Sequence, residues 1–168
     1  MAEILVIAEH RKQKLAEISL EMLTKGRQVA DQSGARLVAV VIGGNIHGYA
    51  LEIANWADKV LAVQNAKLET SLAEPYQKIL SPLIKERKPR IVLLGHSAFG
   101  MDLAPALAVE LGIPLATDCI DIWLENEKVA VKRSVYNGKV NAIYSFAPSE
   151  TIILTGRLGQ FPIKEAQR

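Results

Sequence analysis

The chain has 168 residues, of which 49% are hydrophobic and 23% charged, a composition typical of one globular domain with a substantial core. The formal net charge of +2 is too small to indicate a nucleic-acid or membrane surface, and aromatic residues, at 5%, are too few for base-stacking platforms. Cys119 is the only cysteine, so no internal disulfide can form and a reducing compartment is expected. Neither a secretory signal nor a membrane-spanning apolar run is visible, and we expect a cytoplasmic protein without membrane insertion.

Strand and helix patterns alternate from the start of the chain to about Gly112. Continuous apolar runs, typical of strands buried on both faces, lie at residues 4–8, 37–42, 59–63 and 91–94. Apolar residues recur at helical spacing in residues 15–30, 50–57, 72–84 and 103–111. Gly34 is expected to end the first helix and Thr70-Ser71 to cap the third, which Pro82 should kink or split.

Strands follow strands after Gly112. The strand-like segments are residues 115–124, 128–136, 140–146 and 151–155. Asn137-Gly138 predicts a two-residue hairpin turn, because both central residues of that turn need a positive φ. The whole pattern predicts an α/β fold that forms one domain over residues 1–168. We expect a three-layer, open, mostly parallel sheet with an antiparallel hairpin or edge added after residue 115.

The turn after the strand at residues 91–94 is the candidate ligand loop. In open α/β sheets, ligands bind beyond the carboxyl ends of the strands. The spacing of Gly95 and Gly100 does not make a full dinucleotide fingerprint, and no phosphate-binding Lys-Ser/Thr pair follows. The candidate cofactor contacts in this loop are Gly95, His96, Ser97, Gly100 and Asp102.

Two polar residues of this loop also have simpler interpretations. Ser97 is not spaced as a nucleophile elbow, since the second glycine comes one residue late, and a capping or ligand-contacting hydroxyl is expected instead. Asp102 is expected near the helix start, where a negative charge favours the helix dipole. We therefore predict no catalytic constellation.

Three further groups were candidates for chemistry. The histidines at positions 10, 47 and 96 lie far apart and none is spaced with a second ligand, so no metal site is predicted. Cys119 is expected to be a small buried hydrophobe. Arg133 shares its strand alternation with valines, so its charge needs a partner or an interface, unless it lies exposed on an edge strand.

Several segments, taken together and in order, indicate a protein family more specifically than any one of them does alone. They are residues 4–10, 88–95, 100–105, 111–119, 133–140 and 155–162. They resemble the N-terminal domain of the electron-transfer flavoprotein alpha subunit, and the resemblance covers essentially the whole chain. Met101, Ser134 and Lys139 stand where that family usually has Arg, Pro and Asn.

The resemblance implies an adenine-nucleotide hydrolase-like fold and a scaffold or docking role in a flavin-dependent electron-transfer complex. It implies an electron-carrier component more than a catalyst. In the family, a second domain carries the FAD-binding residues, and we expect this chain to be a stand-alone or truncated form without it. FAD is therefore expected in the intact complex, and not tightly bound by this chain alone.

The resemblance also implies partners. They are a beta-type subunit or a second copy of the chain, with a dehydrogenase in the complex. Interface candidates are Arg133, Tyr136, Asn137 and Arg157. The alternative function is a stand-alone adenine- or flavin-nucleotide-binding module, since a glycine-containing loop before a helix N-terminus suits an anion. The absence of a basic residue from that loop counts against it. A hydrolase has little support.

Overall fold

The computed structural model describes residues 2–11, 13–68, 73–125, 128–147 and 149–164. Its helices are α1 (Glu17–Ser33), α2 (His47–Ile53), α3 (Ala73–Arg87) and α4 (Ala98–Leu111), with a short 3₁₀ helix η1 (Ala66–Leu68). The strands of the main sheet are β1 (Glu3–Ala8), β4 (Arg36–Gly43), β5 (Lys59–Gln64), β6 (Ile91–Gly95), β7 (Leu115–Glu125), β8 (Lys128–Val135), β9 (Val140–Ser145) and β10 (Ile152–Gly156). Two short strands, β2 (His10–Arg11) and β3 (Lys14–Leu15), form a separate antiparallel pair.

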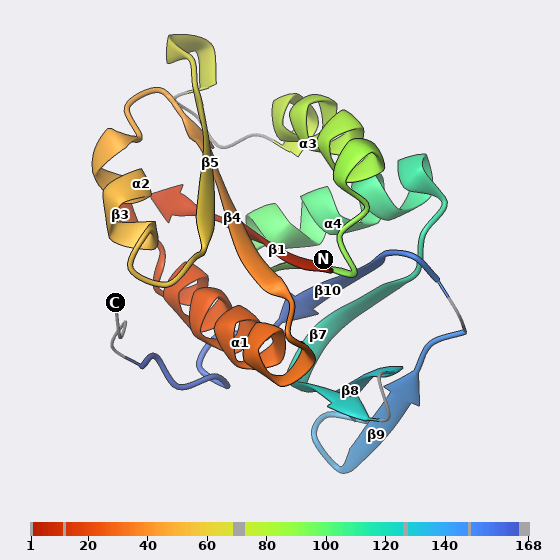
Figure 1. The fold of residues 1–168 in the computed structure, drawn as a ribbon. Coiled ribbons are helices and arrows are strands. Elements are labelled where there is room, and N and C mark those ends of the chain that lie inside the picture. The colour runs from red at the N-terminus through yellow and green to blue at the C-terminus, as the bar shows by residue number, and fades with distance from the viewer. Residues whose placement is uncertain (1, 12, 69–72, 126–127, 148, 165–168) are drawn as a thin grey trace.

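Within the described residues the main sheet has the order β5-β4-β1-β6-β10-β7-β8-β9. The pairs from β5 to β7 are all parallel, and only β7-β8 and β8-β9 are antiparallel. The predicted α/β architecture with an added antiparallel hairpin is therefore confirmed. The prediction did not place β10, which lies inside the parallel sheet between β6 and β7 although it is last in the sequence (Figure 1).

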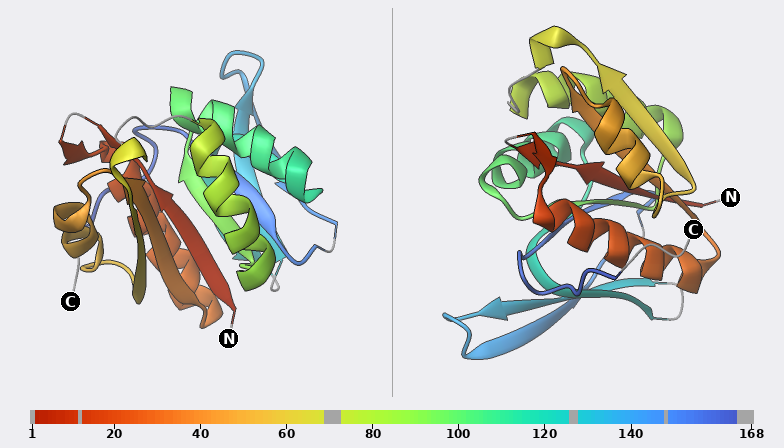
Figure 2. Two further views of the ribbon diagram at one scale, coloured as in Figure 1. Left: turned by 90° about the horizontal axis from the view of Figure 1, so that it is seen from above. Right: turned by 90° about the vertical axis from the view of Figure 1, so that its left-hand side faces the viewer.

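The helices cover both faces of this sheet, as Figure 2 shows from two sides. On one face, α1 and α2 pack on a cluster that contains Ile4 and Val6 of β1. On the other face, α3 and α4 pack on a cluster that contains Leu5 and Ile7. Alternate side chains of β1 thus enter opposite cores, which is why its sequence is a continuous apolar run and does not alternate with polar residues.

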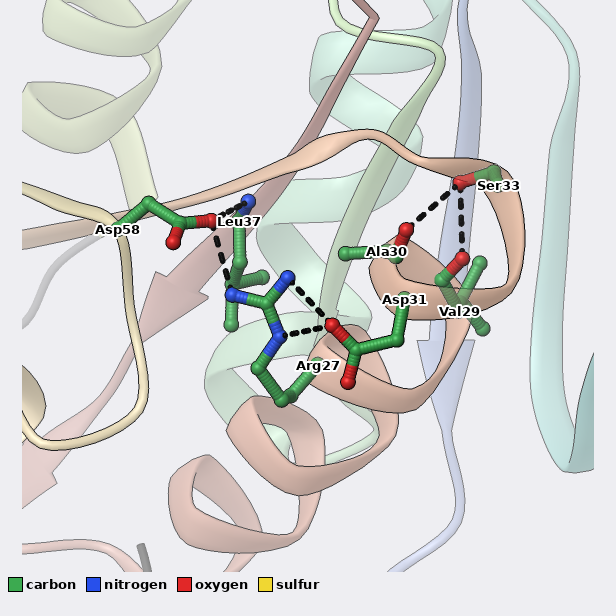
Figure 3. A network of polar contacts seen from close by, with 7 residues as sticks. All are labelled: Arg27, Val29, Ala30, Asp31, Ser33, Leu37 and Asp58. Atoms are coloured by element: carbon green, nitrogen blue, oxygen red, sulfur yellow. Dashed lines mark hydrogen bonds and ion pairs between the residues drawn. The ribbon is translucent and has the colours of Figure 1, made fainter. Parts of the chain in front are cut away.

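The C-terminal end of α1 shows how the local sequence sets the boundary of a helix. Gly34 has φ +62° and its N–H bonds to the Ala30 carbonyl, so the predicted glycine stop is confirmed. Near that end, Arg27 donates to Asp31 at 2.9 Å and to Asp58 at 2.8 Å, and Asp58 also accepts the Leu37 backbone N–H at 2.7 Å (Figure 3). This network joins the last turns of α1 to the start of β4.

One local prediction about α3 was wrong in part, and another is not tested. Pro82 does not split α3, which runs unbroken from Ala73 to Arg87. Tyr76, Leu80 and Ile84 are buried on both sides of the exposed proline, so packing on the sheet holds the helix together despite the lost N–H. The proposed Thr70-Ser71 cap lies outside the described residues.

The hairpin between β8 and β9 turns where the Asn137-Gly138 pair predicts, but its loop is longer. Val135 pairs with Val140, so the loop spans residues 136–139. Tyr136, Asn137 and Gly138 have φ of 51°, 54° and 86°, which is one left-handed residue more than a two-residue turn contains. Because the loop is longer, Tyr136 is part of it and lies at the exposed tip of the hairpin.

Candidate functional site

The carboxyl ends of β1, β6 and β10 meet at one edge of the sheet, beside residues 117–119 of β7. From β1 the chain passes through α1 to β4 on one side, and from β5 it returns through α3 to β6 on the other side of β1. The topological switch point therefore lies between β1 and β6, which is the usual ligand position in an open α/β sheet. Glu9 follows β1 there, and the predicted loop of His96 and Ser97 follows β6.

Glu9 and Ser97 join the two strand ends. Ser97 is the N-cap of α4, and its Oγ accepts the Gly100 backbone N–H at 3.1 Å. The same hydroxyl donates to Glu9 Oε2 at 2.6 Å. On its other side, the Glu9 backbone exchanges two hydrogen bonds with the Ser19 hydroxyl of α1, at 2.7 and 2.8 Å. The expected capping role of Ser97 is confirmed, and a protein carboxylate lies at the start of α4.

The spacing of Gly95 and Gly100 has a packing explanation. A Cβ added to Gly100 would lie 1.9 Å from the Gly95 carbonyl oxygen, which no side chain can tolerate. A Cβ on Gly95 would lie within 2.8 Å of three Ile18 side-chain atoms. Both glycines therefore let α4 begin directly against β6 and α1 lie close to the strand end.

A second polar group lies at the carboxyl ends of β6 and β10 and beside residue 118 of β7. The His96 Nδ1 atom is 2.9 Å from Thr155 Oγ1, which also accepts the Asp118 backbone N–H at 3.0 Å. Arg157 donates two hydrogen bonds to the Asp118 carboxylate, from Nε at 2.8 Å and from an Nη at 2.6 Å. These hydrogen bonds hold the pKa of Asp118 below its ordinary value, with a further contribution from the charges of Arg157, His96 and Arg133.

The predicted site residues thus separate into groups. Gly95, His96, Ser97 and Gly100 lie together at the start of α4. Asp102 does not join them, because α4 already begins at Ala98 and Asp102 is an exposed residue of its second turn. The interpretation of Asp102 as a charge at the helix start was therefore wrong.

The interface candidates lie in two places. Arg157 is paired with Asp118, and Arg133 faces the same region from β8. Arg133 lies over the Tyr144 ring at 5.8 Å and reaches Thr117 Oγ1 at 3.5 Å. It is half-buried, and β9 covers the edge of β8, so Arg133 is no exposed edge-strand residue. Tyr136 and Asn137 lie apart from this region, at the exposed tip of the hairpin.

Residues 4–168 match the family model described as the electron transfer flavoprotein domain. The chain belongs to this family. It is 35% identical over 158 residues to the protein FixB of Clostridium saccharobutylicum, covering 93% of this chain and 47% of that protein. It is 34% identical over 167 residues to the electron transfer flavoprotein subunit alpha of Clostridium acetobutylicum, covering 96% and 50%, and 33% identical over 138 residues to that of Bacillus subtilis, covering 82% and 42%. The predicted resemblance is confirmed, and the chain spans about half the length of these relatives.

Cys119 and the histidines are the remaining candidates for chemistry in this electron transfer flavoprotein domain. Burial raises the pKa of the Cys119 thiol to about 12, so the buried thiol stays protonated. In the described part of the chain, no cluster of three or more His, Cys, Asp or Glu side chains could hold a metal ion. Across the same described ranges, no helix has the length and hydropathy needed to cross a membrane. Ser97 pairs with Glu9 and the Gly100 N–H, whereas the His96 ring turns to Thr155.

Sequence reasoning missed Glu9 and Thr155 as members of the site. The sequence signal that could have identified them was their position at the ends of buried strands. Glu9 directly follows a buried strand, and Thr155 lies near the carboxyl end of another, so both had to come close to a loop that follows a neighbouring parallel strand. That rule places Glu9 only if β1 is known to lie beside β6. Predicting the place of Thr155 requires the position of β10 in the sheet, which no local sequence pattern indicates.

Proposed function

We propose that this chain, acting as one domain over residues 1–168, is the scaffold and docking part of an alpha-type electron transfer flavoprotein. It would pair with a beta-type subunit in the cytoplasm and take part in electron transfer from a dehydrogenase. The observation that carries this proposal is the family match across residues 4–168, together with relatives named as alpha subunits of such proteins. FAD belongs to the complex and is held mainly by residues outside this domain.

The polar groups at the switch point support a scaffold. The Glu9 carboxylate accepts the Ser97 hydroxyl at the start of α4, where a dinucleotide would place its pyrophosphate. Gly100 packs on the Gly95 carbonyl, and its N–H donates to Ser97. The groups that would bind a pyrophosphate thus already hydrogen-bond or pack against one another. This loop, as it lies, does not fit the phosphates of FAD.

Spectroscopy and co-purification test the proposal. The purified chain should show no flavin absorbance near 450 nm at stoichiometric level, and it should co-purify with the beta-type subunit of the same organism when the two are co-expressed. Tight flavin at full stoichiometry on the isolated chain would contradict the scaffold role. Failure to form any complex with the beta-type subunit would contradict the docking role.

A nucleotide-binding module is the second candidate, because the loop of Gly95, His96, Ser97 and Gly100 occupies the topological switch point. Binding there would require Glu9 to release Ser97, since its negative charge opposes a phosphate. Calorimetric titration with AMP, ATP and FAD tests this candidate. It predicts measurable heat, and tighter binding by Glu9→Gln. No heat with any of the three nucleotides, for either protein, would exclude it.

A further inference from the structure

The β8-β9 hairpin extends from the body of the domain, as the right-hand view of Figure 2 shows. β9 forms one edge of the main sheet and pairs only with β8 among the described strands. An edge strand leaves a row of backbone N–H and C=O groups without strand partners. Water or another chain must satisfy them.

The side chains of β9 are also unusually open for apolar residues. Ile143 is 63% exposed, Val140 50% and Tyr144 41%, and Tyr136 at the hairpin tip is 78% exposed. The opposite edge strand, β5, differs, because its Val60 packs against one core and its Leu61 and Val63 against the other. The hairpin therefore presents apolar surface that the fold itself does not use.

β9 lacks the features that usually protect an edge. Residues 140–145 contain no Lys, no other charged residue and no proline, and the strand pairs regularly with β8 over its whole length. Natural edge strands are commonly interrupted by charges, prolines or bulges, which prevent association with other chains. The absence of these features in β9 favours a strand that is meant to be covered.

The charges around β9 indicate what covers it. The projecting part of the hairpin, residues 132–145, contains Lys132, Arg133 and Lys139 and no acidic residue. On the neighbouring strand β7, Asp121, which lies opposite Lys132, is paired with Lys25, and Asp118 is paired with Arg157. Two copies of this hairpin placed edge to edge would bring six cations together, so a second copy is disfavoured. An acidic partner would instead be attracted by these cations.

The apolar character of β9 indicates that its partner is a protein and not a polyanion such as a nucleic acid. A nucleic acid would be bound by basic side chains pointing at phosphates. Here the exposed strand itself carries valine, isoleucine and tyrosine, and its free edge matches the backbone of another polypeptide strand. The basic side chains flank this edge and do not lie on it.

We propose that β9 is a docking strand that extends a sheet of an acidic partner protein, with Lys132 and Lys139 facing acidic residues of that protein. This inference rests on the proposed docking function and names the surface and the chemistry of the partner. Backbone hydrogen bonds along residues 140–145 would supply the geometry, and Ile143 and Tyr144 the apolar contact. The basic side chains would orient the encounter.

The experiment uses the full chain co-expressed with the beta-type subunit of the same organism. Ile143→Ser removes the apolar contact without adding a charge and should lower the affinity at least tenfold, whereas Val109→Ser, at an 84% exposed position on α4, should leave it unchanged. Lys139→Glu should weaken binding most at low salt, and Lys59→Glu at the opposite edge should not. Hydrogen exchange of the amides in residues 140–145 should slow on complex formation.

The outcomes distinguish this inference from the function on which it rests. A complex that forms equally well with Ile143→Ser, or without protection of the β9 amides, would overturn the docking strand and leave the subunit role intact. The absence of any complex with the wild-type chain would overturn both. Binding of β9 to duplex or single-stranded nucleic acid in place of the subunit would overturn the assignment of a protein partner. Circular dichroism and urea unfolding of each variant establish that a lost complex does not reflect a lost fold.

Discussion

Ser97 donates its hydroxyl proton to the Glu9 carboxylate across 2.6 Å, so the residue that follows β1 and the residue that caps α4 form one polar unit. The unit lies at the switch point of the sheet, where open α/β folds bind ligands. Its effect here is structural, because it joins the two strand ends and directs a negative charge toward the helix start. Stability measurements can therefore test it directly.

Ser97→Ala should lower the free energy of unfolding by about 1–2 kcal/mol, because it removes the N-cap of α4 and the hydrogen bond to Glu9. The measurement is the urea midpoint at constant slope. Ser97→Thr retains the hydroxyl and is the matched control, with a smaller loss. An unchanged midpoint in Ser97→Ala would show that the cap contributes nothing.

Gly100→Ala should lower the unfolding free energy by about 1–3 kcal/mol or more, because its Cβ would meet the Gly95 carbonyl oxygen at 1.9 Å and displace α4 from β6. Gly48→Ala is the control, since nothing lies within 4 Å of a Cβ there and Gly48 lies inside α2. Thermal and urea unfolding should show Gly48→Ala as neutral or stabilising by up to about 1 kcal/mol. Equal effects of the two changes would contradict the steric account.

Asp118→Asn should lower stability at neutral pH by about 1 kcal/mol or less, since the ion pair with Arg157 is partly open to solvent. Asn suits the position because Asp118 has φ +58°. The pKa of Asp118 is lower in the folded chain than in the unfolded chain. Its contribution to stability is therefore complete above the ordinary pKa of about 3.9 and is lost as the pH falls through the folded value. Unfolding of both proteins between pH 7 and pH 2 should show the difference between them shrinking at the acidic end. A difference that is constant with pH would refute this linkage.

Cys119 should resist alkylation by iodoacetamide at pH 8 in the folded protein, because burial raises the pKa of its thiol to about 12 and removes access. In concentrated urea the same thiol should react at the rate of a free cysteine. Mass spectrometry of timed samples measures both rates. Fast labelling of the folded chain would show that β7 opens readily around this residue.

The predictable part of the fold was the part whose causes are local. The apolar run of β1, the glycine stop at Gly34 and the turn at Asn137-Gly138 each depend on a few neighbouring residues. The course of α3 through Pro82 was not predictable, because the contacts that preserve it come from the sheet. The position of β10 was missed for the same reason, since strand order is a property of the whole chain.

The candidate site follows the same division. Ser97 as a cap could be read from its place before a helix, and it is confirmed. The partners of Ser97 and His96 are Glu9 and Thr155, which lie 88 and 59 residues away in sequence, and only the strand order brings them together. The predictions of cofactor contacts in the loop and of interface residues at Arg133, Tyr136, Asn137 and Arg157 stay predictions.

The place of β10 also has a consequence for how the chain acquires its structure. β10 is synthesised after β6, β7, β8 and β9, yet it separates β6 from β7 in the finished sheet. The strands β5, β4, β1 and β6 can assemble first, while β7, β8 and β9 must wait for residues 152–156 before they can join them. Assembly of this sheet therefore requires late insertion of β10 as a central strand, and the edge of β6 is open to other chains until residues 152–156 are available.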